Sequence, residues 1–146
     1  MLRRFVVLLH EHPDGDHWDL MLETEPALTT WAVPPQPLPL HSFECRVKKL
    51  PDHRRDYLDY EGPVSQNRGF VRRLDSGTYE IFETPEISET FEKHEIEVTK
   101  NFRLHGKLFN GILSVRQFNN DSVTFCFNNS QASRAVLATG ACPRND

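Results

Sequence analysis

The chain has 146 residues, of which 38% are hydrophobic and 26% charged, and its formal net charge is −4. This composition excludes a disordered chain, and the length suits one domain with its own core. No apolar run in the sequence approaches the roughly 20 residues of a membrane span. We therefore expect a soluble, cytoplasmic protein without a membrane partner.

Most of the chain has the pattern of short β-strands. Residues 5–9 are typical of a buried strand, and residues 18–22 alternate at period two. Further strand patterns follow at 70–74, 78–82, 94–98, 102–104, 111–118 and 123–127. We expect Asp75-Ser76-Gly77 and Asn119-Asn120-Asp121 to be hairpin turns. The sequence therefore predicts a mainly β fold, a small closed or partly closed β-barrel.

A few segments do not fit a strand. Five of the ten prolines lie between Pro26 and Pro39, so we interpret residues 34–39 as an extended surface connection. One or two short helical turns are expected, at residues 53–60 and in the tail 130–146. The stretch before the prolines is too short for a core of its own, so residues 1–146 are interpreted as a single domain.

The charges are distributed unevenly along the chain. Residues 46–73 carry eight Lys and Arg against four Asp and Glu, whereas residues 74–100 carry two against eight. A local basic patch on an acidic protein suits a ligand contacted at a few phosphates better than a long duplex. Two solvated surfaces would produce the same pattern, so charge alone leaves both interpretations open.

A polar constellation lies on and before the second predicted strand. Alternation places two sets of side chains on opposite faces: Trp18, Leu20 and Leu22 on one, and His17, Asp19, Met21 and Glu23 on the other. His10, at the end of the preceding strand, can close over an ion held by His17 and Asp19. Such a nitrogen and oxygen site suits manganese, zinc or ferrous iron. A solvated strand face is the alternative, and His12 competes with His10.

A second polar cluster occupies residues 52–62. His53 and Tyr57 are four residues apart and share one face of a helical turn, where they can grip phosphate oxygens with help from neighbouring arginines. The alternative is an amphipathic turn with Tyr57 and Tyr60 packed inward. The other histidines, His41, His94 and His105, are interpreted as surface or core residues.

Several short motifs follow one another in order. They are Phe5-Val6-Val7-x-x-His10, His17-x-Asp19-Leu20-x-Leu22-Glu23, Trp31-Ala32-Val33-Pro34, Asp52-His53-x-x-Asp56-Tyr57-x-x-x-Glu61-Gly62, Gly77-Thr78-Tyr79-Glu80 and Leu104-His105-Gly106-x-Leu108-x-x-Gly111. Over residues 3–118 the chain resembles the 3′-phosphoesterase domain of bacterial DNA ligase D, and more closely the small free-standing members of that family. The resemblance implies a β-barrel enzyme that uses Mn²⁺, with Zn²⁺ or Co²⁺ as alternatives. It implies trimming of DNA or RNA 3′ ends in repair, beside a separate ligase or polymerase.

The resemblance also implies roles for particular residues. His10, His17 and Asp19 would bind the metal. His53 and Tyr57 would contact the scissile phosphate, with His53 a general acid or transition-state stabiliser. Glu23 and Glu61 match other polar positions of the family's motifs and would have supporting roles, and we expect the neighbouring Arg54 and Arg55 to support phosphate binding.

Two departures from the family leave other functions open. Its ligase-fused members carry an Arg at the position of Met21 and a Lys at that of Pro35, both tied to phosphate handling. Arg46, Arg54 or Arg55 could replace them in space. The alternative function is a catalytically weakened module of the same fold that binds a metal or a nucleic-acid end. A third hypothesis is a ferrous-iron oxygenase, with His94 or His105 in place of His10.

Overall fold

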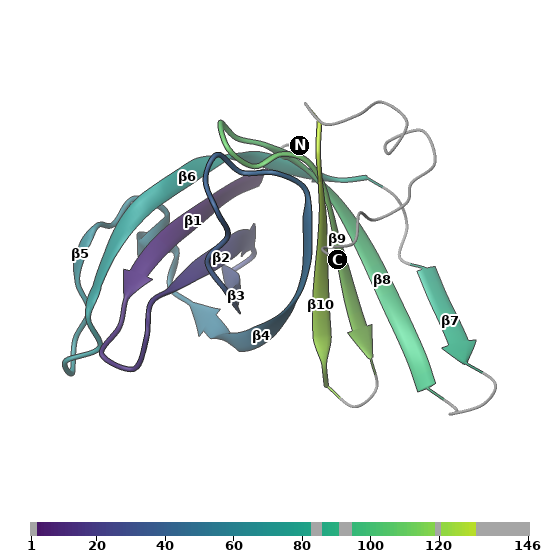
Figure 1. Ribbon diagram of the computed structural model, residues 1–146. Coiled ribbons are helices and arrows are strands. Elements are labelled where there is room, and N and C mark those ends of the chain that lie inside the picture. Colours follow the sequence, from purple (N-terminus) through teal and green to yellow (C-terminus); the bar gives the residue numbers. More distant parts are fainter. Residues whose placement is uncertain (1–2, 83–85, 91–94, 119–120, 131–146) are drawn as a thin grey trace.

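The computed structural model describes residues 3–82, 86–90, 95–118 and 121–130, most of which lie in β-strands (Figure 1). The elements are β1 (Arg3–Glu11), β2 (His17–Thr24), β3 (Ala27–Val33), β4 (Phe43–His53), the 3₁₀ turn η1 (Arg55–Leu58), β5 (Gly62–Pro63), β6 (Phe70–Ile81), β7 (Glu86–Thr90), β8 (Glu95–His105), β9 (Asn110–Phe118) and β10 (Val123–Asn129). Within these ranges, no helix has the length and apolar character to cross a membrane.

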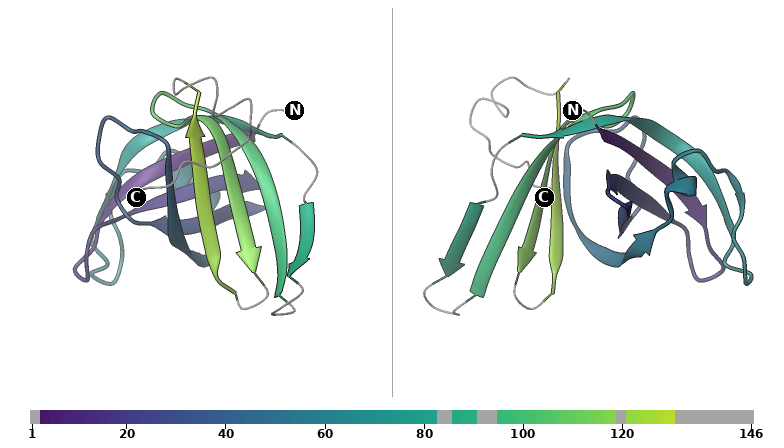
Figure 2. Two further views of the ribbon diagram at one scale, coloured as in Figure 1. Left: turned by 45° about the vertical axis from the view of Figure 1, so that its right-hand side comes forward. Right: turned by 180° about the vertical axis from the view of Figure 1, so that it is seen from behind.

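Eight of the strands form a closed antiparallel barrel, which confirms the predicted fold class. Hydrogen-bonded neighbours follow the order β5-β6-β1-β2-β3-β4-β10-β9-β8-β7, and an additional pairing of β6 with β8 closes the ring. This closure extends from Thr78, opposite His105, to Ile81, opposite Phe102. Figure 2 shows the strongly curved β1–β4 part facing the straighter strands β8, β9 and β10.

Side-chain alternation builds an apolar cluster on each side of the sheet. The inner cluster fills the barrel with side chains from strands all round the ring, such as Phe5, Leu20 and Phe125. The second cluster lies on the opposite face and consists of Val6, Leu8, Met21, Leu28, Leu58 and Val71. Because Leu58 belongs to η1 and is 3% exposed, its burial holds this short turn against the outside of the barrel. Burial of one such side chain contributes about 1.5–3 kcal/mol.

Several further predictions are confirmed. The face of Trp18, Leu20 and Leu22 points into the inner cluster, and residues 34–39 connect β3 to β4 without joining a strand. The helical turn expected at residues 53–60 is η1. Strands β9 and β10 pair as expected on either side of the second predicted turn. Asn119, Asn120, His94 and the tail from residue 131 onward lie outside the described residues.

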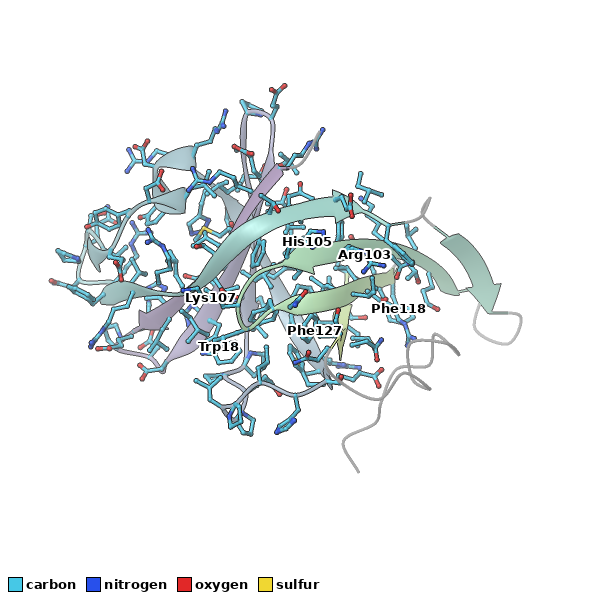
Figure 3. The ribbon with its side chains drawn as sticks, turned by 90° about the horizontal axis from the view of Figure 1, so that it is seen from above. Trp18, Arg103, His105, Lys107, Phe118 and Phe127 are labelled. Carbon is cyan, nitrogen blue, oxygen red and sulfur yellow. The ribbon has the colours of Figure 1, made fainter. Side chains whose placement is uncertain are left out.

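The predicted hairpin at Asp75-Ser76-Gly77 is wrong, because β6 passes through these residues as one strand. The buried Asp75 carboxylate instead accepts hydrogen bonds from three successive backbone N–H groups of the β8–β9 loop. The donors are Lys107 at 3.1 Å, Leu108 at 3.0 Å and Phe109 at 2.7 Å. A Cβ on Gly77 would lie 2.1 Å from the His105 carbonyl oxygen. Asp75 and Gly77 therefore hold β6 against β8 and the β8–β9 loop. Figure 3 labels Lys107 of this loop.

Candidate metal and phosphate site

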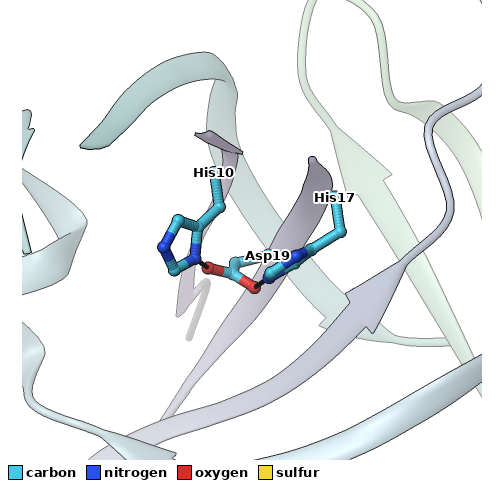
Figure 4. A group of neighbouring side chains, drawn as sticks. All are labelled: His10, His17 and Asp19. Atoms are coloured by element: carbon cyan, nitrogen blue, oxygen red, sulfur yellow. Dashed lines mark hydrogen bonds and ion pairs between the residues drawn. The ribbon is translucent and has the colours of Figure 1, made fainter. Parts of the chain in front are cut away.

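The β1–β2 hairpin brings the three predicted metal ligands together. His10 is directly opposite His17 in the ladder, and Asp19 follows two residues later on the same face of β2. The two imidazole centroids are 4.7 Å apart. One potential ligand atom from each of the three residues lies within 4.8 Å of the other two. Figure 4 shows the Asp19 carboxylate between the two rings, so the predicted convergence of His10, His17 and Asp19 is confirmed.

The carboxylate of Asp19 is buried, with 2% of the residue exposed. Its Oδ2 lies 2.9 Å from Nδ1 of His10. Its Oδ1 lies 2.9 Å from Nε2 of His17, an ion pair when that ring is protonated, and no other described residue donates to it. A buried carboxylate oxygen is costly unless a hydrogen bond or a cation neutralises it. Either a protonated His17 or a metal ion in its place meets this need, so the carboxylate fits a metal ligand.

A backbone carbonyl orients the His10 imidazole. Nε2 of His10 lies 2.6 Å from the Arg68 carbonyl oxygen, which only accepts, so this nitrogen carries a proton and donates. The remaining Nδ1 faces Asp19. The Gly15 backbone beside His17 also favours the protonated form of that ring, raising its pKa. Metal-binding histidines typically donate the second N–H to a carbonyl or carboxylate, as His10 does, so the surroundings of the triad fit a divalent ion.

The charge of Asp19 also affects the titration of its neighbour. The carboxylate beside the ring raises the pKa of His17 above its ordinary value of 6.5, although partial burial opposes this effect. Protonated His17 is thereby stabilised when no metal is bound. A metal ion needs the deprotonated ring, so protons and metal compete for the same nitrogen.

A cavity of about 700 Å³ opens above the triad. Part of its wall is formed by His53 at the end of β4, by Arg54 after it and by Tyr57 of η1. The remaining lining residues are His12, Asp14, Gly15, Ala32, Lys48, Leu50, Pro51, Asp52, Val64, Ser65, Arg68 and Val71. The cavity therefore joins the two polar clusters that the sequence singled out separately.

His53 and Tyr57 lie together in this wall. Their rings meet edge to face with centroids 5.5 Å apart. The His53 Nδ1 lies 2.9 Å from the Pro51 carbonyl oxygen, so Nδ1–H donates and Nε2 is left for a ligand. Tyr57 packs against the second apolar cluster, beside Tyr60. The shared face expected from the four-residue spacing is confirmed.

Of the four residues with predicted supporting roles, one lines the cavity and three do not. Arg54 lines the cavity. Arg55 forms an ion pair with Glu23, and neither lines the cavity. Glu61 also lies outside it, where its carboxylate accepts a 2.8 Å hydrogen bond from the backbone N–H of Arg73.

Met21 and Pro35, the two positions that differ from the expected family pattern, do not line the cavity. Met21 is completely buried in the second apolar cluster, and Pro35 is exposed in the β3–β4 connection. Neither belongs to the cavity lining. His105, the substitute ligand in the oxygenase hypothesis, instead lies 3.3 Å from Glu80 and outside the cavity.

Sequence reasoning missed two cations of the cavity wall, Lys48 and Arg68. Both belong to the basic stretch 46–73, and this excess of positive charge is the sequence feature that could have indicated them. Arg68 is held by hydrogen bonds to Ser65. His12, the competing ligand, stands 5.3 Å from His10 between ring centroids, and its Nδ1 accepts from the backbone N–H of Asp14.

Comparison with known proteins gives two matches. The model of the DNA ligase D 3′-phosphoesterase domain matches residues 9–116. The multifunctional non-homologous end joining protein LigD of Pseudomonas aeruginosa is 31% identical over 113 residues, or 75% of this chain. The chain spans only 13% of the length of that protein. The matched region contains the triad as well as His53 and Tyr57.

Proposed function

The chain belongs to the DNA ligase D 3′-phosphoesterase family, and on this basis we propose that it is a metal-dependent phosphoesterase that processes 3′ ends of nucleic acid in repair. The observation that carries the proposal is the buried Asp19 carboxylate between the His10 and His17 imidazoles, on the wall of a cavity shared with His53 and Tyr57. The proposed metal ligands and the proposed phosphate-binding residues thus line the same cavity.

In this proposal His10 Nδ1, His17 Nε2 and an Asp19 oxygen hold a divalent ion. Two nitrogens and one oxygen suit Mn²⁺, with Zn²⁺ and Co²⁺ as alternatives. When bound, such an ion polarises a phosphoryl oxygen and makes a bound water more acidic. The Arg68 carbonyl keeps the His10 imidazole in an orientation that leaves Nδ1 for the ion.

His53 and Tyr57 act on the phosphate itself. With its Nδ1 proton committed to the Pro51 carbonyl, His53 presents Nε2, which donates a proton only in the imidazolium form. That form is suited to protonating a leaving oxygen or to stabilising charge on the transferring phosphoryl group. The Tyr57 hydroxyl adds a second donor, and Arg54 contributes positive charge at the same wall.

The proposed substrate is a DNA or RNA 3′ end, either a terminal ribonucleoside or a 3′-phosphate. Phosphate contacts are independent of base sequence, so such a site needs no base readout. The relative's name refers to non-homologous end joining. We accordingly propose that the ends produced here are joined or extended by a separate ligase or polymerase.

One observation favours a second candidate, a binding module with weakened chemistry. Met21 and Pro35, the positions at which the family resemblance leads us to expect cations, are apolar here. Such a module would bind a metal or a nucleic-acid end without turnover.

The test measures phosphate release from a primer with a 3′-phosphate. Protein freed of metal by a chelator should be inactive and should regain release when Mn²⁺ is added. Asp19→Asn should bind no Mn²⁺ and release no phosphate, whereas His105→Ala, which changes a histidine outside the cavity, should match the wild type. Mn²⁺ binding and end binding without any release would favour the binding module.

A further inference from the structure

A lateral row of side chains crosses the outer face of the sheet beside the triad. Asp19 of β2 is paired with Ala32 of β3, and Ala32 with Lys48 of β4. Directly paired residues of antiparallel strands point to the same face. Lys48 therefore projects from the same face as the metal triad, and all three members of the row line the cavity.

The row leaves space for a ligand between its two charged ends. Neighbouring strands lie about 4.8 Å apart, so the backbones of Asp19 and Lys48 are separated by roughly 10 Å. Ala32 contributes only a methyl group to the floor between them. The flexible four-carbon stem of a lysine can carry its ammonium group over that floor.

Among the described residues, Lys48 has no charged partner. Its side chain is exposed and forms no ion pair or hydrogen bond with any described residue. The adjacent Lys49 differs, because its ammonium lies 3.5 Å from Asp52 and donates to the Leu50 carbonyl. Lys49 also belongs to the other face, over the Trp31 ring.

We infer that Lys48 binds the terminal phosphoryl group of the substrate and makes the site selective for 3′ ends that carry a phosphate. This inference rests on the proposed function. A group standing over Ala32 would lie between the metal ligands and the ammonium of Lys48. A terminal phosphate monoester carries more negative charge than an internal diester, so a point charge at this position favours the phosphorylated end.

The test compares binding of two labelled single-stranded DNA oligonucleotides in the presence of Mn²⁺. One ends in a 3′-phosphonomethyl group, which carries the charge of a phosphate but has no ester bond to hydrolyse, and the other ends in a 3′-hydroxyl. Wild type should prefer the phosphonate end. Lys48→Met should lose about tenfold or more of this preference, the magnitude of one charge-assisted contact.

Two further variants control this result. Lys49→Met removes the same charge from the neighbouring position and should retain the preference, and Lys48→Arg should retain most of it. Equal loss in both Met variants, or an unchanged preference in Lys48→Met, would overturn the inference. It would also be overturned if wild type bound both ends equally. A wild type that prefers the phosphonate end but releases no phosphate contradicts the proposed hydrolysis and leaves the inference standing.

Discussion

The Asp75 carboxylate accepts a 2.7 Å hydrogen bond from the backbone N–H of Phe109, a residue 34 positions further along the chain. Two more donors of the same loop share this carboxylate, which is 5% exposed. Phe109 is itself completely buried in the inner cluster. The bond thus couples β6 to the core, close to the segment in which β6 pairs with β8.

We expect Asp75→Asn to destabilise the protein by about 3 kcal/mol or more. An amide accepts more weakly, and its NH₂ group opposes backbone donors that would remain buried. Urea denaturation measures the change in the free energy of unfolding. Asp59→Asn is the control, because its ion pair with Arg4 is exposed and should contribute little. A similar, small effect of both variants would show that the buried carboxylate does not hold the loop.

The raised pKa of His17 predicts opposite pH dependences for stability and metal binding. In the metal-free protein, protonated His17 stabilises the fold below about pH 6.5, and this contribution is lost as the pH rises through the raised folded-state pKa. Mn²⁺ affinity should increase over the same interval, because the metal needs the deprotonated ring. An NMR titration of the His17 ring in metal-free protein tests the raised pKa. Measurements of Mn²⁺ affinity at several pH values test the second dependence. A His17 that titrates below pH 6.5 would contradict the prediction.

Removing His53 or Tyr57 from the cavity wall should affect turnover more than metal binding, if they act on the phosphate as proposed. We expect His53→Ala to lower the rate of 3′-phosphate release by about 100-fold or more, and Tyr57→Phe by about 10-fold or more, with Mn²⁺ affinity unchanged. Tyr60→Phe is the matched control, since its hydroxyl donates to the Pro63 carbonyl at 2.5 Å and does not line the cavity. Equal losses in both tyrosine variants would point to packing of η1 instead.

Burial raises the pKa of the Cys45 thiol to about 11, from an ordinary 9.0. The thiolate is the reactive form, so its fraction at pH 8 is about 100-fold lower than in an unfolded chain. Alkylation of Cys45 by iodoacetamide, followed by peptide mass spectrometry, should therefore be slow in native protein and fast in urea. Equal rates in the two conditions would show that the thiol is not shielded.

Local periodicity predicts the site well where its residues are close in sequence. His17 and Asp19 share a strand face by the period of two, and His10 reaches them through a short hairpin. His53 and Tyr57 likewise meet across one turn. The pairing of Arg55 with Glu23 was not predictable, because η1 packs on the outside of β1 and β2 through contacts distant in sequence.

The sequence by itself therefore determined the faces of the strands, the convergence of His10, His17 and Asp19, and the turn that carries His53 and Tyr57. The tertiary structure decided the closure of β6 on β8, the role of Asp75 inside a strand and the position of Lys48 in line with Asp19. The reason is physical: alternation specifies the side of a strand to which each residue points, whereas contacts between distant residues depend on which strands pair and in what register.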